Sequence, residues 1–135
     1  MRDQEEENKV DNSRKSILAR GCDPLLSLQF SKVAPQLLGN VEYVPTTNDI
    51  EFVEQLKSRD WSVIYFAPGA CRFSAVNKQI PGGNTETAGW TLVEYRELIV
   101  NLQRDNIQIV ETPYESEALE FLKRGLDKAR ETKLA

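Results

Sequence analysis

The chain has 135 residues, with 21 acidic and 17 basic side chains, a formal net charge of −4 and no histidine. Its length fits one domain with or without a tail, and its mild acidity gives no long-range attraction to nucleic acid or to anionic lipid. The lack of histidine excludes Ser-His-Asp triads, Cys-His dyads and histidine-based metal sites. Two cysteines, Cys22 and Cys71, cannot complete a zinc site of four ligands, so we predict no metal site.

Residues 1–16 are predicted to form a disordered, charged arm. They are rich in charged side chains and too poor in apolar ones to offset the entropy lost on ordering. The arm lacks the apolar run of a secretory signal, and no run in the chain approaches the roughly 20 apolar residues of a membrane span. We therefore expect a cytoplasmic protein that binds neither membranes nor nucleic acid.

Residues 17–40 are predicted to form a separate N-terminal helical segment. Asp23 before Pro24 is typical of a helix N-cap followed by the first helical residue. An apolar run follows, and Pro35 is expected to end the helix. Because short apolar runs are ambiguous by periodicity alone, a strand over residues 25–30 is the alternative.

From Val41 onwards, strands and helices alternate. Residues 41–44 are β-branched or aromatic at alternate positions, which predicts a strand ending at Pro45. Asn48 and Glu51 have the spacing of a capping box at the start of a helix. The uninterrupted apolar run 61–67 is typical of a central strand that is buried on both faces of a parallel sheet. The apolar face of the helix between these strands is expected to contain Ile50, Val53 and Leu56.

The same pattern continues after a long connection over residues 68–90. Thr91 and Glu94 form a capping box, residues 107–110 are a third strand, and residues 112–115 have the pattern of another capping box. Gly125 lies within the last helix, where it costs about 1 kcal/mol relative to alanine, so we expect close packing at this position. The apolar face of that helix consists of Ala118, Leu122, Leu126 and Ala129.

This order of elements predicts a three-layer Rossmann-like (flavodoxin-like) α/β fold over residues 41–135. A small parallel sheet would have helices on both faces, with right-handed crossovers. Three strands leave two exposed edges, so we expect either an extra strand from residues 25–30 or pairing with a second subunit.

Ligands of open α/β sheets bind outside the carboxyl ends of the strands, where helices present free N–H groups. Here that edge comprises residues 45–48, 68–74 and 111–112. Arg72 is suited to hold a phosphate or a carboxylate. The predicted ligand-binding residues are Thr46, Thr47, Gly69, Arg72, Ser74 and Thr112. A structural interpretation stays open, in which Thr47 and Thr112 cap helices, Gly69 forms a turn and Arg72 is a solvated surface residue.

Cys71 and Glu111 are the candidate catalytic residues. Cys71 follows the buried strand and lies near Arg72 and a helix N-terminus, both of which lower the pKa of a thiol. Without histidine it lacks the usual base, and a structural cysteine is the alternative. Glu111 is the carboxylate at the strand ends. The chain has neither a G-x-G-x-x-G nor a P-loop motif, so the sequence identifies no cofactor.

Residues 52–56, residues 63–68 and the pair Cys71-Arg72 together resemble the first helix, central strand and active-site entry of thioredoxins. The Cys-x-x-Cys pair of that family is absent, and the chain continues as helix, strand and helix from Thr91. The resemblance therefore implies only a buried strand that leads into a functional loop, without redox activity.

Three functions follow from these patterns. The leading hypothesis is a module that binds a small anionic ligand or a protein partner at the carboxyl edge of its sheet. The second is an enzyme of the same fold that uses Cys71 or Glu111 with Arg72. The third is a structural subunit that docks through residues 25–38.

Overall fold

The computed structural model describes residues 10–21, 23–67, 84–88, 90–111 and 114–132. They contain a four-stranded sheet in the order β2-β1-β3-β4, in which every pair of neighbouring strands is parallel. The predicted parallel α/β architecture is therefore confirmed. The strands are β1 (Ser16–Arg20), β2 (Glu42–Thr46), β3 (Val63–Phe66) and β4 (Gln108–Glu111).

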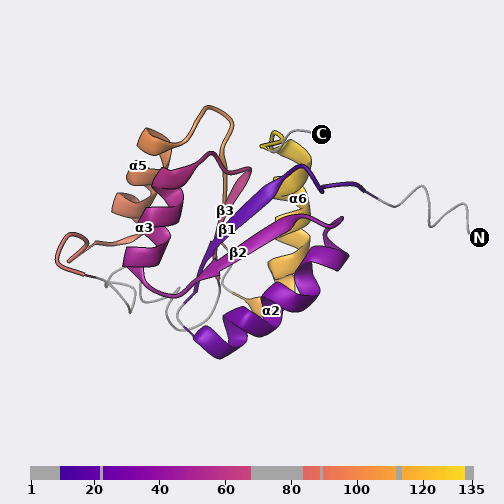
Figure 1. Cartoon of the computed structure of the whole chain (residues 1–135), viewed down its shortest axis with the longest axis horizontal. Coiled ribbons are helices and arrows are strands. Elements are labelled where there is room, and N and C mark those ends of the chain that lie inside the picture. Colours follow the sequence, from indigo (N-terminus) through magenta and orange to yellow (C-terminus); the bar gives the residue numbers. More distant parts are fainter. Residues whose placement is uncertain (1–9, 22, 68–83, 89, 112–113, 133–135) are drawn as a thin grey trace, which may run out of the picture.

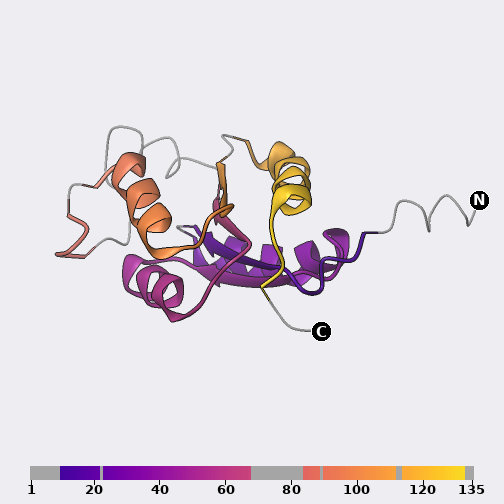
Figure 2. The same ribbon diagram turned by 90° about the horizontal axis from the view of Figure 1, so that it is seen from above.

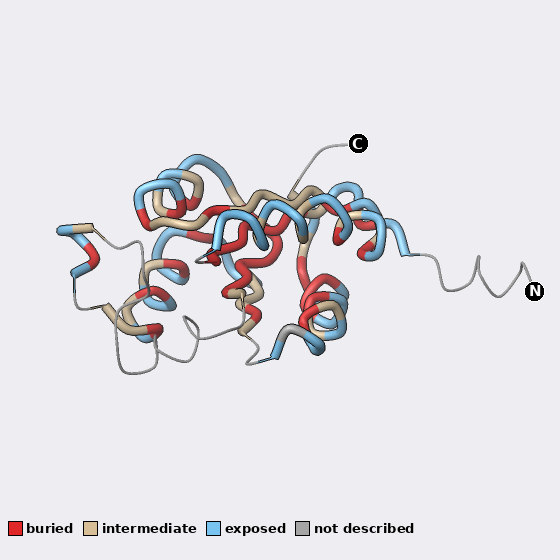
Figure 3. Tube along the Cα trace, turned by 90° about the horizontal axis from the view of Figure 1, so that it is seen from below, coloured by how far each residue is buried: buried red, intermediate tan, exposed pale blue. Residues whose placement is uncertain are grey.

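Helices cover both faces of this sheet (Figures 1 and 2). On one face α2 (Pro24–Leu37) packs over β2, and α6 (Ala118–Lys128) packs over β3 and β4 after the short helix η1 (Glu115–Glu117). On the other face lie α3 (Asp49–Ser58) and α5 (Leu92–Leu102). The buried residues gather where the helices face the sheet, so each face has its own hydrophobic core (Figure 3).

The strand β1 corrects the prediction of three strands that begin at Val41. Residues 17–40 were expected to be helical, yet Ser16–Arg20 is an interior strand that pairs with both β2 and β3. The extra strand is also not residues 25–30, which belong to α2. In the sequence this strand is indicated only by three consecutive apolar residues, which lie between Ser16 and Arg20. A run of that length is too short to be distinctive.

Residues 10–15 have defined contacts instead of the disorder that we expected for the arm. The buried side chain of Asn12 donates from Nδ2 to the Leu38 carbonyl at 2.9 Å, and its backbone N–H donates to the Gly39 carbonyl at 2.7 Å. Gly39 has a φ of 80°, and a Cβ atom there would lie 2.3 Å from the Val10 carbonyl oxygen. Glycine at position 39 is thus required both by its backbone conformation and by the close approach of the N-terminal segment.

Two prolines lie inside elements that they were expected to end. The helix α2 continues past Pro35 to Leu37, and β2 includes Pro45. In β2 the N–H of Glu42 donates toward β1, to the Lys15 carbonyl. Because backbone N–H groups alternate in direction along a strand, position 45 faces the open edge, where proline removes no ladder hydrogen bond.

The apolar faces of the remaining helices agree with the prediction in part. The capping box of Thr91 and Glu94 at the start of α5 is confirmed. All four apolar residues predicted for the last helix are buried, but α6 begins only after η1 and has no side-chain cap. In α3 the prediction fails for Ile50, which is 65% exposed, because the buried face is rotated to Asp49, Phe52 and Leu56.

Gly125 packs as the sequence predicts, and this leads to a test by mutation. A Cβ atom at position 125 would lie 2.9 Å from Cγ2 of Val110, a stiff β-branched side chain. We expect Gly125→Ala to destabilise the protein by about 1 kcal/mol, since overpacking outweighs the gain in helix propensity. In a Val110→Ala background the same change should stabilise by up to about 1 kcal/mol. Urea unfolding of the four proteins measures both values, and equal effects in the two backgrounds would contradict this packing.

The cap of α5 predicts a pH dependence. The N–H of Thr91 donates to Glu94 Oε1 at 2.6 Å and its hydroxyl donates at 2.7 Å, and these bonds lower the pKa of Glu94. A carboxyl group whose pKa is lower in the folded protein than in the unfolded chain stabilises the fold at pH values above the unfolded pKa. This stabilisation is lost as the pH falls through the pKa of the folded state. Glu94→Gln should therefore destabilise the protein near neutral pH, and the difference from wild type should shrink as the pH falls toward about 3. Glu97→Gln, at an exposed position of α5, is the control, and a difference that stays constant with pH would refute the expectation.

Candidate functional site

The carboxyl ends of the four strands meet at one edge of the sheet, as the sequence predicts. Arg20 at the end of β1 is aligned with Thr46 of β2 and with Phe66 of β3, and Phe66 is aligned with Glu111 of β4. The chain passes from β1 outward to β2 and then returns to β3 on the other side of β1. The topological switch point, where open α/β sheets bind ligands, therefore lies between the ends of β1 and β3.

At this edge most of the described polar groups already have partners within the protein. The hydroxyl of Thr46 is buried and donates to the Ala19 carbonyl at 2.6 Å, whereas Thr47 is partly exposed next to the cap of α3. Asp23 accepts hydrogen bonds from the first amides of α2, and Asn48 does so for α3. The side-chain caps therefore occupy the helix N–H groups that an anion would use.

Glu111 forms an ion pair between β4 and α5. Arg96 donates from Nε to Oε2 at 2.8 Å and from Nη2 to Oε1 at 2.5 Å. This two-pronged contact raises the pKa of Arg96. Arg96 therefore engages both carboxylate oxygens of Glu111 within the protein.

The other predicted site residues lie outside the described part of the chain. These are Gly69, Cys71, Arg72, Ser74 and Thr112. The anion site around Arg72 and the reactive thiol of Cys71 therefore stay predictions.

A buried network that the sequence reasoning missed lies beside the switch point. Arg20 donates from Nε to Asp49 Oδ1 at 2.9 Å, and neither side chain has exposed surface. The hydroxyl of Tyr95 donates to Asp49 Oδ2 at 2.6 Å, and Arg20 Nη1 donates to the Gly21 carbonyl. Burial raises the pKa of Tyr95, and the hydrogen bond to Asp49 raises it further, so its hydroxyl stays protonated at neutral pH.

This network links segments that are distant in sequence. Arg20 ends β1, Asp49 begins α3 and Tyr95 lies in the second turn of α5. The side chain of Thr87, held in a turn by hydrogen bonds with Asn84, also contacts Tyr95. Since Asp49 uses one oxygen for a cation and the other for a hydroxyl, it is a satisfied structural carboxylate and not an accessible acid or base.

One sequence signal points to this network. Asp49 lies at helical spacing from Phe52 and Leu56, on the apolar face of α3. A carboxylate on a buried face requires a cation or hydrogen-bond donors. Arg20 directly follows a short apolar run and is therefore a candidate for that cation. Its position at the end of an interior strand is known only from the structure.

The described residues contain no cluster of three or more His, Cys, Asp or Glu side chains that could bind a metal ion. Over the same residues, no helix has the length and apolar character to cross a membrane.

The chain matches no protein-family model, no curated protein and no solved structure. Its function has to be argued from its own geometry.

Replacing Arg20 and Asp49 together should destabilise the protein less than replacing Asp49 alone. Asp49→Leu leaves Arg20 buried without its counter-charge, and we expect a loss of about 3–5 kcal/mol in the free energy of unfolding. Arg20→Met combined with Asp49→Leu removes both charges and should recover most of that loss. The exposed pair of Arg124 and Glu120 is the control, because Glu120→Ala should cost less than about 1 kcal/mol. Guanidinium unfolding compares the variants, and a double variant no more stable than Asp49→Leu would argue against the assignment.

Proposed function

We propose that the protein is a structural subunit that self-associates through the outward side of α2. The observation that carries this proposal is a set of large apolar side chains that are between 49% and 63% exposed along one helix. Ala34 is the only residue of α2 that is buried. We call the set the α2 surface, and it consists of Leu25, Leu26, Leu28, Val33 and Leu37.

The composition of α2 also favours an interface. Its sequence contains a single charged residue, Lys32. A helix that faces solvent usually carries charges opposite its apolar stripe, as α6 does on the same face of the sheet. The centres of protein–protein interfaces contain few charged residues, and the α2 surface shares this feature.

The spacing of these residues favours a second copy of this chain as the partner. Leu26, Val33 and Leu37 follow one another at steps of seven and four, which is the spacing that packs two helices along a seam. A twofold axis would bring this apolar seam against its own copy, and twofold dimers are the commonest oligomers. Lys32 lies roughly 120° around the helix from the seam, so its charge is not brought against its copy.

The size of the α2 surface predicts a weak dimer. Fully burying a leucine or valine side chain contributes about 1.5–3 kcal/mol, so covering the half-exposed seam residues, three from each copy, contributes roughly 4–9 kcal/mol. Association costs about 4–15 kcal/mol in lost freedom. The small surplus corresponds to a dissociation constant in the micromolar range or weaker.

The neighbouring edge strand is a poorer candidate for the contact. Pro45 lies on the open edge of β2 and provides no N–H group for a continuing sheet. Binding of a small anionic ligand, or catalysis by Cys71 or Glu111 with Arg72, stays a prediction, because the segment that contains Cys71 and Arg72 lies outside the described residues.

Sedimentation velocity over about 1–200 μM protein tests the proposal. We expect the wild-type mass to rise from monomer toward dimer, whereas Leu26→Gln combined with Val33→Gln should remain monomeric at unchanged helix content. The matched control replaces two exposed valines of α5, Val93→Gln with Val100→Gln, and should still dimerise. A wild type that stays monomeric throughout, or equal loss of association in both double variants, would overturn the proposal.

A further inference from the structure

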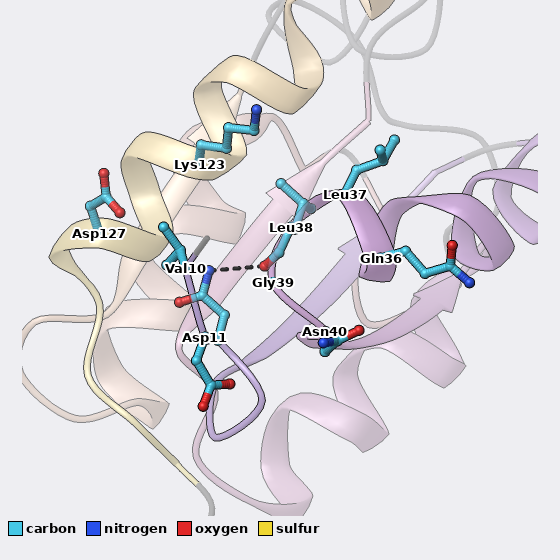
Figure 4. A pocket seen from close by; sticks show the side chains of 10 residues that line it. Val10, Asp11, Gln36, Leu37, Leu38, Gly39, Asn40, Lys123 and Asp127 are labelled. Carbon is cyan, nitrogen blue, oxygen red and sulfur yellow. Dashed lines mark hydrogen bonds between the residues drawn. The ribbon is translucent and has the colours of Figure 1, made fainter. Parts of the chain in front are cut away.

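A second site candidate lies at the edge of the sheet opposite the predicted one. A cavity of about 570 Å³ is bounded by the N-terminal segment, the end of α2 and one side of α6 (Figure 4). Its walls include Asn12, shortly before β1, and Gly39 and Asn40, shortly before β2. It therefore lies at the amino ends of the strands, and we call it the basal pocket. Its volume lies within the range of about 300–1,000 Å³ found for small-molecule sites.

The wall of the basal pocket contains a buried acceptor without a donor. Asn12 is 5% exposed, and its Nδ2 donates to the Leu38 carbonyl, the bond drawn in Figure 4. Its Oδ1 atom has no hydrogen-bond partner. Buried polar atoms in folded proteins are nearly always paired, so the buried Oδ1 atom of Asn12 is an exception beside this cavity.

Two opposite charges face this pocket without partners. Lys123 and Asp127 both line it from α6, and within the described residues neither side chain forms an ion pair or a hydrogen bond. Their side chains extend in different directions from the helix (Figure 4). The order of a cation followed by an anion four residues later is the less favourable one for pairing within a helix, so both charges remain open to a ligand.

The rest of the wall is apolar and held in place. Val10 and Leu37 line the pocket and each exposes more than half of its surface. Asn40 has a left-handed φ of 65° and follows Gly39, which is also left-handed. The close approach of Val10 to Gly39 fixes this wall, and such strained backbone gathers at binding sites.

We propose that the basal pocket binds a small zwitterion with an aliphatic body, namely a free aliphatic amino acid or a dipeptide of such residues. The carboxylate pairs with Lys123 and the ammonium group pairs with Asp127. The aliphatic body covers Val10 and Leu37. The site shares Leu37 with the α2 surface, but its two charges, Lys123 and Asp127, lie on α6 outside that surface.

Calorimetric titration with four probes tests the ligand class. The probes are L-leucine, L-leucyl-L-leucine, 4-methylpentanoate, which lacks the ammonium group, and 3-methylbutylamine, which lacks the carboxylate. We expect at least one zwitterion to bind with a dissociation constant on the order of 1 mM or lower, and about tenfold more tightly than either singly charged probe. The tighter of the two zwitterions identifies the free amino acid or the dipeptide. No saturation by either zwitterion, or equal binding of a singly charged probe, would refute the proposal.

Variants of α6 then assign the two charges. Lys123→Ala should weaken binding of the zwitterion about tenfold and remove its advantage over 3-methylbutylamine. Asp127→Asn should weaken it similarly and remove the advantage over 4-methylpentanoate. Both positions are exposed, so melting curves should be unchanged, and Lys57→Ala on the opposite face of the sheet is the control. Undiminished binding by both α6 variants, or an equal loss in the control, would show that these charges do not hold the ligand.

Discussion

The buried ion pair of Arg20 and Asp49 is the constraint on which the arrangement of this fold depends. An interior strand ends in an arginine, and the chain has to supply a counter-charge where water is absent. Asp49 provides it from the first turn of α3, and Tyr95 of α5 saturates the remaining carboxylate oxygen. The positions of β1, α3 and α5 are therefore coupled, since none can shift without leaving a buried charge or hydroxyl unpaired.

This coupling makes the carboxyl edge of the sheet a less favourable place for a binding site. The carboxyl edge of a parallel sheet usually offers free amides and side chains to a ligand. Here Thr46, Asn48 and Glu111 of that edge are used within the protein, in a hydrogen bond, a helix cap and an ion pair. Among the described residues, the α2 surface and the charges of the basal pocket lack internal partners. Both proposals follow from this contrast.

The two helices on one face of the sheet show the contrast directly. The helix α6 buries its apolar face completely and places charges on its solvent side. In α2 only Ala34 is buried, and leucines lie where charges are expected. Since both helices meet the same solvent, this difference points to a partner for α2.

The sequence alone determined the elements whose signals are local. The apolar run of β3, the capping box of Thr91 and Glu94 and the apolar face of α6 depend on neighbouring residues, and all three agree with the structure. Tertiary structure alone decided the place of β1, the rotation of α3 that buries Asp49 and exposes Ile50, and the basal pocket. The physical reason is that a buried charge depends on a partner that folding brings from far along the chain. Asp49 lies 29 residues from Arg20 and 46 from Tyr95, a distance at which periodicity and capping patterns carry no information.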